Sequence, residues 1–443
     1  MLRLNSKDLA ACLVGFVAFG HPPMAIAEIL DIAITSTATH GEFEGKKYQK
    51  IEATVRGRAP GGKYSIPLTI AFAADPQQRG DVAIVDVVNT VTIGEKGFVI
   101  GGAALPTARI HMGDTFLFGG GRSYFAPIWD KKAVEQLKNG SISASADGYT
   151  ILADISKLAR DPAELIPDGP TASGKVIAYG YSQTGALLRD WFATGRNDDH
   201  ANSAFDAGLI ISAGSLCLDL GSGEYRECTG DISGGIKVIN VAPETDVELG
   251  GHLERAEGDT YRHIEVAGVP HIPADAADFR SHGLPDQNPI GFGPVARAAV
   301  ENLEGWLAGK NPFANLYMEL ADGPVRMVQG NKYRAVKRDA AGNGLGGVRL
   351  PHLATSLPRG KDGGAPLGVS NGLNWKHEQD NYFFFIAGRF EPFPDEKVKE
   401  LYPTRDVYVD RVKAAAEHLL GMRYIIKSDA DAYVAEAQSK PPW

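Results

Sequence analysis

The segment spanning residues 175–192 constrains the fold more than any other part of the sequence. An apolar run at 175–179 (Lys-Val-Ile-Ala-Tyr) predicts a buried strand, and the residues at 186–192 have a helix-like sequence. Between them lie Gly180-Tyr181-Ser182-Gln183-Thr184-Gly185. A strand that turns sharply into a helix brings two backbones close together, so small residues are needed on both sides of the turn. Gly180 and Gly185 supply that space, and Ser182 at the turn is a candidate nucleophile.

Apolar runs of similar length recur along the chain and alternate with helix-sized segments. Such runs, rich in β-branched residues, are typical of strands covered on both faces. The pattern therefore predicts a doubly wound, mostly parallel sheet. Before it, residues 28 to about 74 alternate in short runs broken by Gly and Pro, which predicts a β-rich, antiparallel N-terminal part. The six core runs lie at 81–89, 124–129, 175–179, 207–211, 236–241 and 263–267.

Two later regions differ from this pattern. Residues 282–380 form a loose, Gly- and Pro-rich stretch, and a connection of this length is typical of a lid or rim over a site. Helical spacing returns at 407–420, and a helix is also expected at 131–138. We expect a single domain over residues 28–443, with 282–380 as its lid or rim.

A nucleophilic serine needs a base to accept its proton and an acid to orient that base. The fifth predicted core strand is followed by Glu244-Thr245-Asp246, and the sixth by Gly268-Val269-Pro270-His271. Because parallel strands end at one edge of a sheet, these groups are expected near Ser182. We predict His271 as the base and either Glu244 or Asp246 as the acid. Competing histidines nearby are His252, His263 and His282.

The reaction also needs N–H donors for the negative charge that develops on the substrate oxygen. By geometric analogy we expect them from the backbone of Gln183, directly after the serine, and of Asn89 or Thr90, after the first core strand.

The N-terminal segment and the cysteines of the chain indicate export. Residues 1–27 read as a signal peptide, with a basic start, a short apolar stretch and a small-residue cleavage site at Ala25-Ile26-Ala27. Cys12 lies within this signal peptide. The other two cysteines, Cys217 and Cys228, form an even pair in a Gly-rich, polar segment, which predicts a disulfide. A periplasmic or secreted protein is therefore expected.

The composition excludes several classes of partner. With a formal charge of −9 and a pI near 5.7, the chain has no basic stripe for nucleic acid. It has neither a dense basic cluster for an anionic membrane nor a later apolar segment long enough for a membrane span. The cysteines and histidines lack zinc spacing, so no metal is expected, and no other cofactor.

Together these residues resemble the alpha/beta hydrolase domain family, a largely uncharacterised bacterial branch of the α/β-hydrolases. The resemblance rests on 180–185, on Glu244-Thr245-Asp246, on 266–268 leading to His271, and on 346–351, and it includes Leu401-Tyr402-Pro403 with Tyr408-Val409 and the helix beyond. It implies the α/β-hydrolase fold, Ser182 as nucleophile, His271 as base and Glu244 at the acid position.

The expected function is that of an exported serine hydrolase that cleaves a small carboxylic ester through an acyl-enzyme. The acidic balance favours a neutral or aromatic ester, and possible pocket walls lie at Trp375, Tyr382, Phe383, Phe384 and Phe385, which core packing also explains. The alternatives are an acyltransferase or amidase with the same triad, or a non-catalytic binding protein of the same fold. The ester and the oligomeric state are not indicated by the sequence.

Overall fold

The computed structural model describes residues 28–59, 62–87, 89–91, 98–100, 103–105, 108–110, 119–127, 144–197, 204–219, 225–228, 233–250, 258–273, 288–354, 364–379, 382–440 and 442. The predicted signal peptide at 1–27 and the predicted helix at 131–138 lie outside these residues. No helix within the described part of the chain is both long and apolar enough to cross a membrane.

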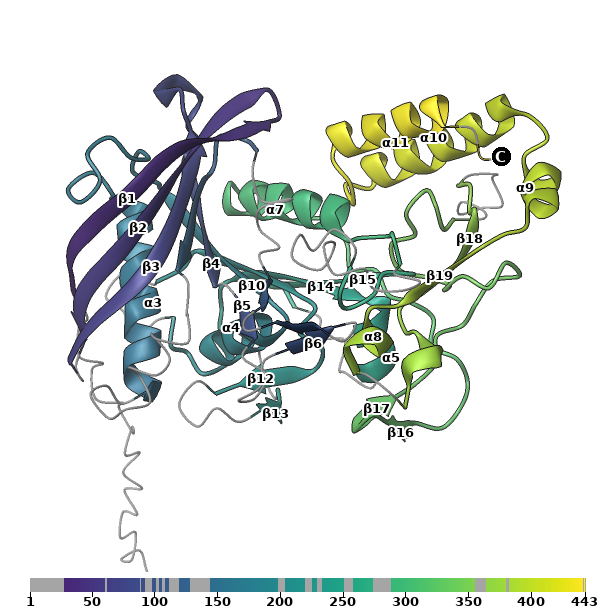
Figure 1. Ribbon diagram of the computed structural model, residues 1–443, viewed down its shortest axis with the longest axis horizontal. Coiled ribbons are helices and arrows are strands. Elements are labelled where there is room, and N and C mark those ends of the chain that lie inside the picture. The colour runs from purple at the N-terminus through teal and green to yellow at the C-terminus, as the bar shows by residue number, and fades with distance from the viewer. Residues whose placement is uncertain are drawn as a thin grey trace, which may run out of the picture.

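A nine-stranded sheet forms the centre of the molecule (Figure 1). Its strands lie in the order β1-β2-β3-β9-β4-β10-β11-β14-β15. The six from β9 to β15 are parallel, and β1 to β3 join them as an antiparallel extension. Both expectations, a mostly parallel core and a β-rich N-terminal part, are confirmed. The strands are β1 Glu28–Phe43, β2 Lys46–Ala59, β3 Gly62–Ala73, β4 Val82–Val87, β9 Ser123–Pro127, β10 Lys175–Tyr181, β11 Ala207–Ile211, β14 Lys237–Pro243 and β15 Tyr261–Val266.

Helices cover both faces of this sheet. Side chains of β10 alternate between two buried clusters, with Ile177 and Tyr179 on one face and Val176 and Ala178 on the other. Helices α3 (Ala144–Arg160) and α4 (Gln183–Ala193) pack on the second face, and α7 (Gly293–Leu307) packs on the first. Figure 1 shows α7 and α4 on opposite sides of β10 and β14. The core is therefore buried on both faces, as the apolar runs predict.

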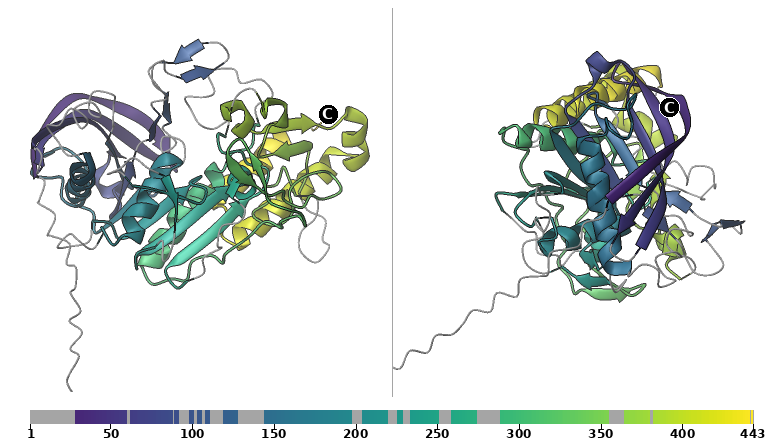
Figure 2. Two further views of the ribbon diagram at one scale, coloured as in Figure 1. Left: turned by 90° about the horizontal axis from the view of Figure 1, so that it is seen from below. Right: turned by 90° about the vertical axis from the view of Figure 1, so that its left-hand side faces the viewer.

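The N-terminal and C-terminal elements lie at opposite ends of the molecule (Figure 2). Strands β1 to β3 arch over α3, with which β2 and β3 share an apolar cluster. At the other end, α10 (Arg405–Gly421) lies beside α11 (Lys427–Ser439). The predicted helix at 407–420 is thus confirmed, and it buries Val412, Ala416 and Leu419. The remaining helices are α5 Glu244–Gly250, α8 Tyr382–Ile386 and α9 Asp395–Leu401.

The region at 282–380 contributes to the sheet edge and to short hairpins. Single bridges join Leu316 to Ile264 and Val348 to Val266, alongside β15. The pair β16 (Arg326–Val328) and β17 (Asn331–Tyr333) and the pair β18 (Gly368–Asn371) and β19 (Arg389–Pro392) form two small sheets. Motion of this region as a lid, and the assignment of 28–443 to one domain, stay predictions.

The order of the strands distinguishes one position in the sheet, the boundary between β4 and β10. After β4 the chain forms β9 on one side of it, and then returns to form β10 on the other side. In an open parallel sheet, a crevice opens at the carboxyl ends of strands where the winding reverses in this way. Ser182 follows directly after β10, so the candidate nucleophile lies at this crevice.

The turn after β10 is tight and strained. Ser182 has φ of 55° and ψ of −116°, an unusual conformation for a residue with a side chain. A Cβ atom added at Gly180 would lie 2.6 Å from the carbonyl oxygen of Thr184 and 2.9 Å from the nitrogen of Gly185. Because both are backbone atoms, they cannot move aside without displacing the first turn of α4.

We therefore expect Gly180→Ala to lower the free energy of unfolding by about 1–3 kcal/mol or more, by steric overlap at the turn. Gly323→Ala is the matched control, since no heavy atom lies within 4 Å of its added Cβ. It should change stability by about 0.5 kcal/mol at most. Urea denaturation of both variants checks the expectation, and equal effects would contradict it.

Candidate active site

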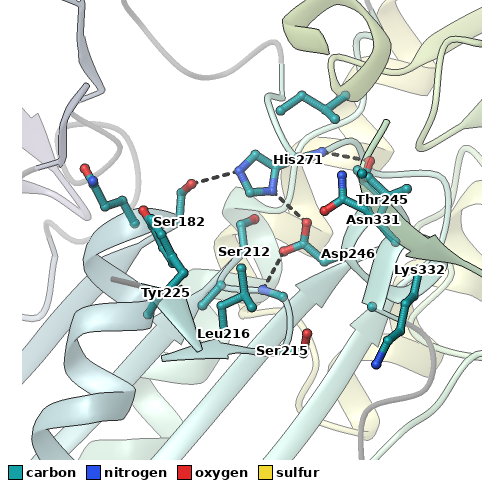
Figure 3. Close-up of a pocket in the computed structure, with 18 of the residues that line it drawn as sticks. Ser182, Ser212, Ser215, Leu216, Tyr225, Thr245, Asp246, His271, Asn331 and Lys332 are labelled. Carbon is teal, nitrogen blue, oxygen red and sulfur yellow. Dashed lines mark hydrogen bonds and ion pairs between the residues drawn. The ribbon is translucent and has the colours of Figure 1, made fainter. Parts of the chain in front are cut away.

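The hydroxyl of Ser182 faces the ring of His271 (Figure 3). Ser182 Oγ lies 2.8 Å from His271 Nε2, a normal hydrogen-bond distance. The backbone N–H of Ser182 donates to the carbonyl of Ile211, which fixes the turn to the end of the neighbouring strand β11. The serine is half-buried, so a substrate can reach it.

The turn after β15 presents His271 to the serine. Its backbone N–H donates to Thr245 Oγ1 at 3.0 Å, and its carbonyl accepts a hydrogen bond from the hydroxyl of Tyr181. Its ring nitrogen Nδ1 lies 2.6 Å from Asp246 Oδ1. With Nδ1 bound to a carboxylate, Nε2 is left to accept the proton of Ser182.

The structure places the two candidate acids differently. Asp246 contacts His271, whereas Glu244, which the family resemblance places at the acid position, does not. Both Glu244 oxygens are bound elsewhere: Oε2 accepts from the N–H of Gly268 at 2.7 Å, and Oε1 accepts from Arg338 Nη2 at 2.8 Å. The two residues start the same helix, α5, where a separation of two positions is about 200° of rotation. They therefore point to opposite sides of the helix.

The second carboxylate oxygen of Asp246 is also hydrogen-bonded. Its Oδ2 accepts from the N–H of Gly214 at 3.2 Å, and the carbonyl of Gly214 accepts from Arg189 Nη1. Arg189 is 2% exposed and donates also to Asn240 Oδ1 at 2.8 Å. The sequence interpretation missed Arg189 and Gly214. The available signal was a single arginine inside the apolar run of α4, because a buried charge needs fixed partners.

The predicted oxyanion donors follow the carboxyl ends of β10 and β4, where Ser182 also lies. Gln183 is the first residue of α4, and the first N–H groups of a helix lack intrahelical partners. Val87 pairs with Gly180 in the parallel register, and Asn89 follows Val87 by two residues, as Ser182 follows Gly180. Asn89 and Thr90 begin β5 (Asn89–Val91), which pairs with β8 (Ala108–Ile110). Their role stays a prediction.

The sequence matches one protein family over most of its length. The match covers residues 129–435 and is to the family described as "Alpha/beta hydrolase domain". The chain belongs to the alpha/beta hydrolase domain family. This confirms the family that the sequence motifs indicate. No curated protein matches the chain.

Several solved structures share parts of this hydrolase fold at low sequence identity. A promiscuous CE15 esterase from the marine bacterial metagenome is 11% identical, with a TM-score of 0.28, over 50% of this chain and 71% of that one. The glucuronoyl esterase from Solibacter usitatus is 9% identical, with a TM-score of 0.31, over 62% and 74%. A putative dienelactone hydrolase from Klebsiella pneumoniae is 12% identical, with a TM-score of 0.31, over 55% and 93%. Likenesses this distant carry no argument about the substrate.

A cavity of about 640 Å³ opens at the serine of the hydrolase. Its walls are mostly apolar, and three of the large apolar side chains that the described residues expose, Tyr225, Met327 and Tyr382, stand along it. Of the five aromatics predicted as pocket walls, Tyr382 and Phe383 line the cavity, whereas Phe385 is buried in the core and Trp375 and Phe384 pack against it. Its other main lining residues are Gln183, Ala186, Ser212, Ala213, Gly214, Ser215, Leu216, Leu249, Asn331, Lys332 and Ile386.

The charges at the cavity are paired with each other. Lys332 Nζ lies 2.6 Å from Glu227 Oε1, and this ion pair joins two hairpins across the cavity wall. Asp246, the third charged lining residue that the structure describes, is bound to His271. Within the described chain, no three His, Cys, Asp or Glu side chains gather as a metal site would require.

The predicted disulfide is confirmed and supports one wall of the cavity. Cys217 and Cys228 are bonded, with their Cα atoms 5.1 Å apart. They join the hairpin of β12 (Leu216–Leu218) and β13 (Tyr225–Glu227). The same hairpin contacts α4, because Arg226 pairs with the buried Asp190. The disulfide thus holds a wall segment against the helix that follows Ser182.

A second buried carboxyl, Glu248, lies one turn after Glu244. Burial, and then the neighbouring Glu244 carboxylate, raise the pKa of Glu248 to about 8 from an ordinary 4.5. The folded hydrolase therefore holds this proton more tightly than the unfolded chain does. The resulting stabilisation is complete below about pH 4.5 and is lost as the pH rises through 8.

Glu248→Gln should remove this pH dependence, because an amide does not titrate. Relative to wild type, the free energy of unfolding of the variant should rise between about pH 5 and 8, by on the order of 1–4 kcal/mol. Urea denaturation at several pH values measures the difference. A difference that stays constant with pH would contradict the raised pKa.

Proposed function

We propose that this protein is a serine hydrolase that cleaves a carboxylic ester through an acyl-enzyme. The observation that carries the proposal is the continuous hydrogen-bond chain from Ser182 through His271 to Asp246. Such a chain activates a hydroxyl that is otherwise a weak nucleophile. Asp246 takes the acid role in this proposal.

The reaction has two halves. In the first, Ser182 Oγ attacks the ester carbonyl while His271 Nε2 takes the hydroxyl proton, and the same nitrogen then protonates the leaving alkoxide. In the second, His271 Nε2 removes a proton from water as the water oxygen attacks the acyl-enzyme carbonyl. The bond between the acyl carbon and Ser182 Oγ then breaks, His271 Nε2 returns the proton to that oxygen, and the acid is freed. Asp246 keeps Nδ1 protonated and stabilises the imidazolium that forms in both halves.

Backbone N–H groups would stabilise the oxyanion of each tetrahedral intermediate. The N–H of Gln183 suits this role, since it opens α4 beside the serine, and Asn89 or Thr90 would supply the second donor. Losing one such donor typically costs about 10²- to 10³-fold in rate. These assignments rest on the position of the residues at the carboxyl ends of β10 and β4.

The cavity favours a neutral ester with an apolar or aromatic group. The cations and anions along its wall are already paired, so a charged substrate finds no free partner among the described residues. Tyr225, Met327 and Tyr382 expose apolar surface where such a group would bind. Burial of apolar surface provides about 25 cal/mol per Å².

Export is part of the proposal. The disulfide between Cys217 and Cys228 is typical of an oxidising compartment, such as the periplasm or the cell exterior. The signal-like segment at 1–27 is consistent with this location.

The triad is tested by turnover of nitrophenyl and aromatic methyl esters by protein beginning at Glu28. Ser182→Ala and His271→Ala should lower kcat by about 10⁴- to 10⁶-fold, and Asp246→Asn by about 10⁴-fold, because each breaks the hydrogen-bond chain from Ser182 through His271 to Asp246. Neutral esters should turn over faster than esters that carry a carboxylate. Turnover that survives Ser182→Ala would contradict the proposal.

A further inference from the structure

Three consecutive side chains bind the turn that carries His271. Glu244 Oε2 accepts from the N–H of Gly268 at 2.7 Å, Thr245 Oγ1 accepts from the N–H of His271 at 3.0 Å, and Asp246 Oδ1 lies 2.6 Å from its ring. The start of α5 thus holds residues 268–271 at both ends and at the imidazole.

Glu244 connects this turn to two further segments. Its Oε1 accepts from Arg338 Nη2 at 2.8 Å and from the N–H of Gly372 at 3.1 Å. Thr245 also binds Gly372, because its hydroxyl donates to the carbonyl of that residue. One fully buried carboxylate therefore joins the His271 turn, the end of β18 and the loop of Arg338.

The backbone around Glu244 has room for a carboxylate and little else. A Cβ added at Gly344 would lie 2.7 Å from Glu244 Oε2, and one added at Gly372 would lie 2.9 Å from Glu244 Cβ. Gly268 has a φ of 69°, which is strained for any residue with a side chain. Gly344 and Gly372 thus let the backbone pass close to Glu244, and Gly268 and Gly372 donate their N–H groups to its carboxylate.

One cation lies between the two buried carboxyl groups of α5. Arg338 lies 2.8 Å from Glu244 and 3.5 Å from Glu248, so one cation faces two carboxyls. Burial and the Glu244 carboxylate raise the pKa of Glu248 to about 8, so Glu248 keeps its proton at neutral pH. Arg338 supplies the positive charge that faces Glu244. A buried charge of this kind is tolerated only when it is paired and hydrogen-bonded.

We propose that Glu244, paired with Arg338, is a positioning residue that fixes the 268–271 turn so that His271 Nδ1 stays on Asp246. The inference rests on the proposed function for its effect on turnover. Glu244 touches no reacting atom and acts through the backbone of Gly268. Without its carboxylate, one anchor of the turn is lost and the imidazole is less firmly held against Asp246.

The test compares Glu244→Gln with Glu248→Gln, a buried neighbour that also faces Arg338 but contacts no residue of the 268–271 turn in any described interaction. A glutamine has one acceptor oxygen, so it cannot serve Arg338 and Gly268 as the carboxylate does. Glu244→Gln should lower kcat by about 10- to 100-fold, as expected for a small displacement of a catalytic group, with KM changed by about twofold at most. Glu248→Gln should keep kcat within about twofold at pH 7.

A second readout does not depend on turnover. A ring proton shared between His271 Nδ1 and Asp246 gives a low-field proton NMR signal, which Asp246→Asn identifies by its loss. The signal should broaden or move upfield in Glu244→Gln and persist in Glu248→Gln. If Glu244→Gln does not fold, Arg338→Lys and Arg338→Met replace it, with the lysine variant retaining more kcat and more of the signal.

Two results would overturn the inference. One is a folded Glu244→Gln protein that loses thermal stability but keeps kcat and the low-field signal, which would make Glu244 a purely structural residue. The other is loss of turnover in Glu244→Gln with full turnover in Asp246→Asn, which would make Glu244 the acid itself. If wild type cleaves no ester, the proposed function fails, and the NMR comparison alone still decides the role of Glu244.

Discussion

The hydrogen bond between Asp246 and His271 is the interaction on which the rest of the site depends. It joins residues from the ends of two neighbouring strands, and it decides which ring nitrogen of His271 faces Ser182. Its 2.6 Å distance requires that α5 and the turn after β15 be held in register. The parallel pairing of β14 and β15, with Pro243 opposite Val266, supplies the coarse alignment. Side chains around the acid supply the fine alignment.

That fine alignment comes from buried charges. Arg189 lies on one side of Asp246 and acts through the peptide of Gly214, whereas Arg338 lies on the other side and acts through Glu244. Buried charges are costly to desolvate, so they add little net stability. They do impose geometry, because each must keep its partners. The arrangement suits a site in which a displacement of about 1 Å can cost a hundredfold in rate.

The sheet and the tight turn at Ser182 could be predicted because they depend on local sequence. Runs of β-branched residues identify buried strands, and the glycines at 180 and 185 identify the tight turn between a strand and the helix that follows it. The acid could not be chosen this way, because Glu244 and Asp246 are two positions apart and the rotation of α5 decides which one faces His271. Arg338 comes from 94 residues further along the chain, and nothing in the sequence around it indicates a link to Glu244. Long-range contacts of this kind depend on the packed fold.

The most direct test of the account is covalent labelling with a fluorophosphonate, followed by mass mapping of the digested protein. If His271 and Asp246 activate Ser182, the adduct should map to the peptide that contains Ser182, and labelling should nearly cease in Asp246→Asn. Labelling at another residue, or undiminished labelling of Asp246→Asn, would contradict the central role of the Asp246–His271 bond.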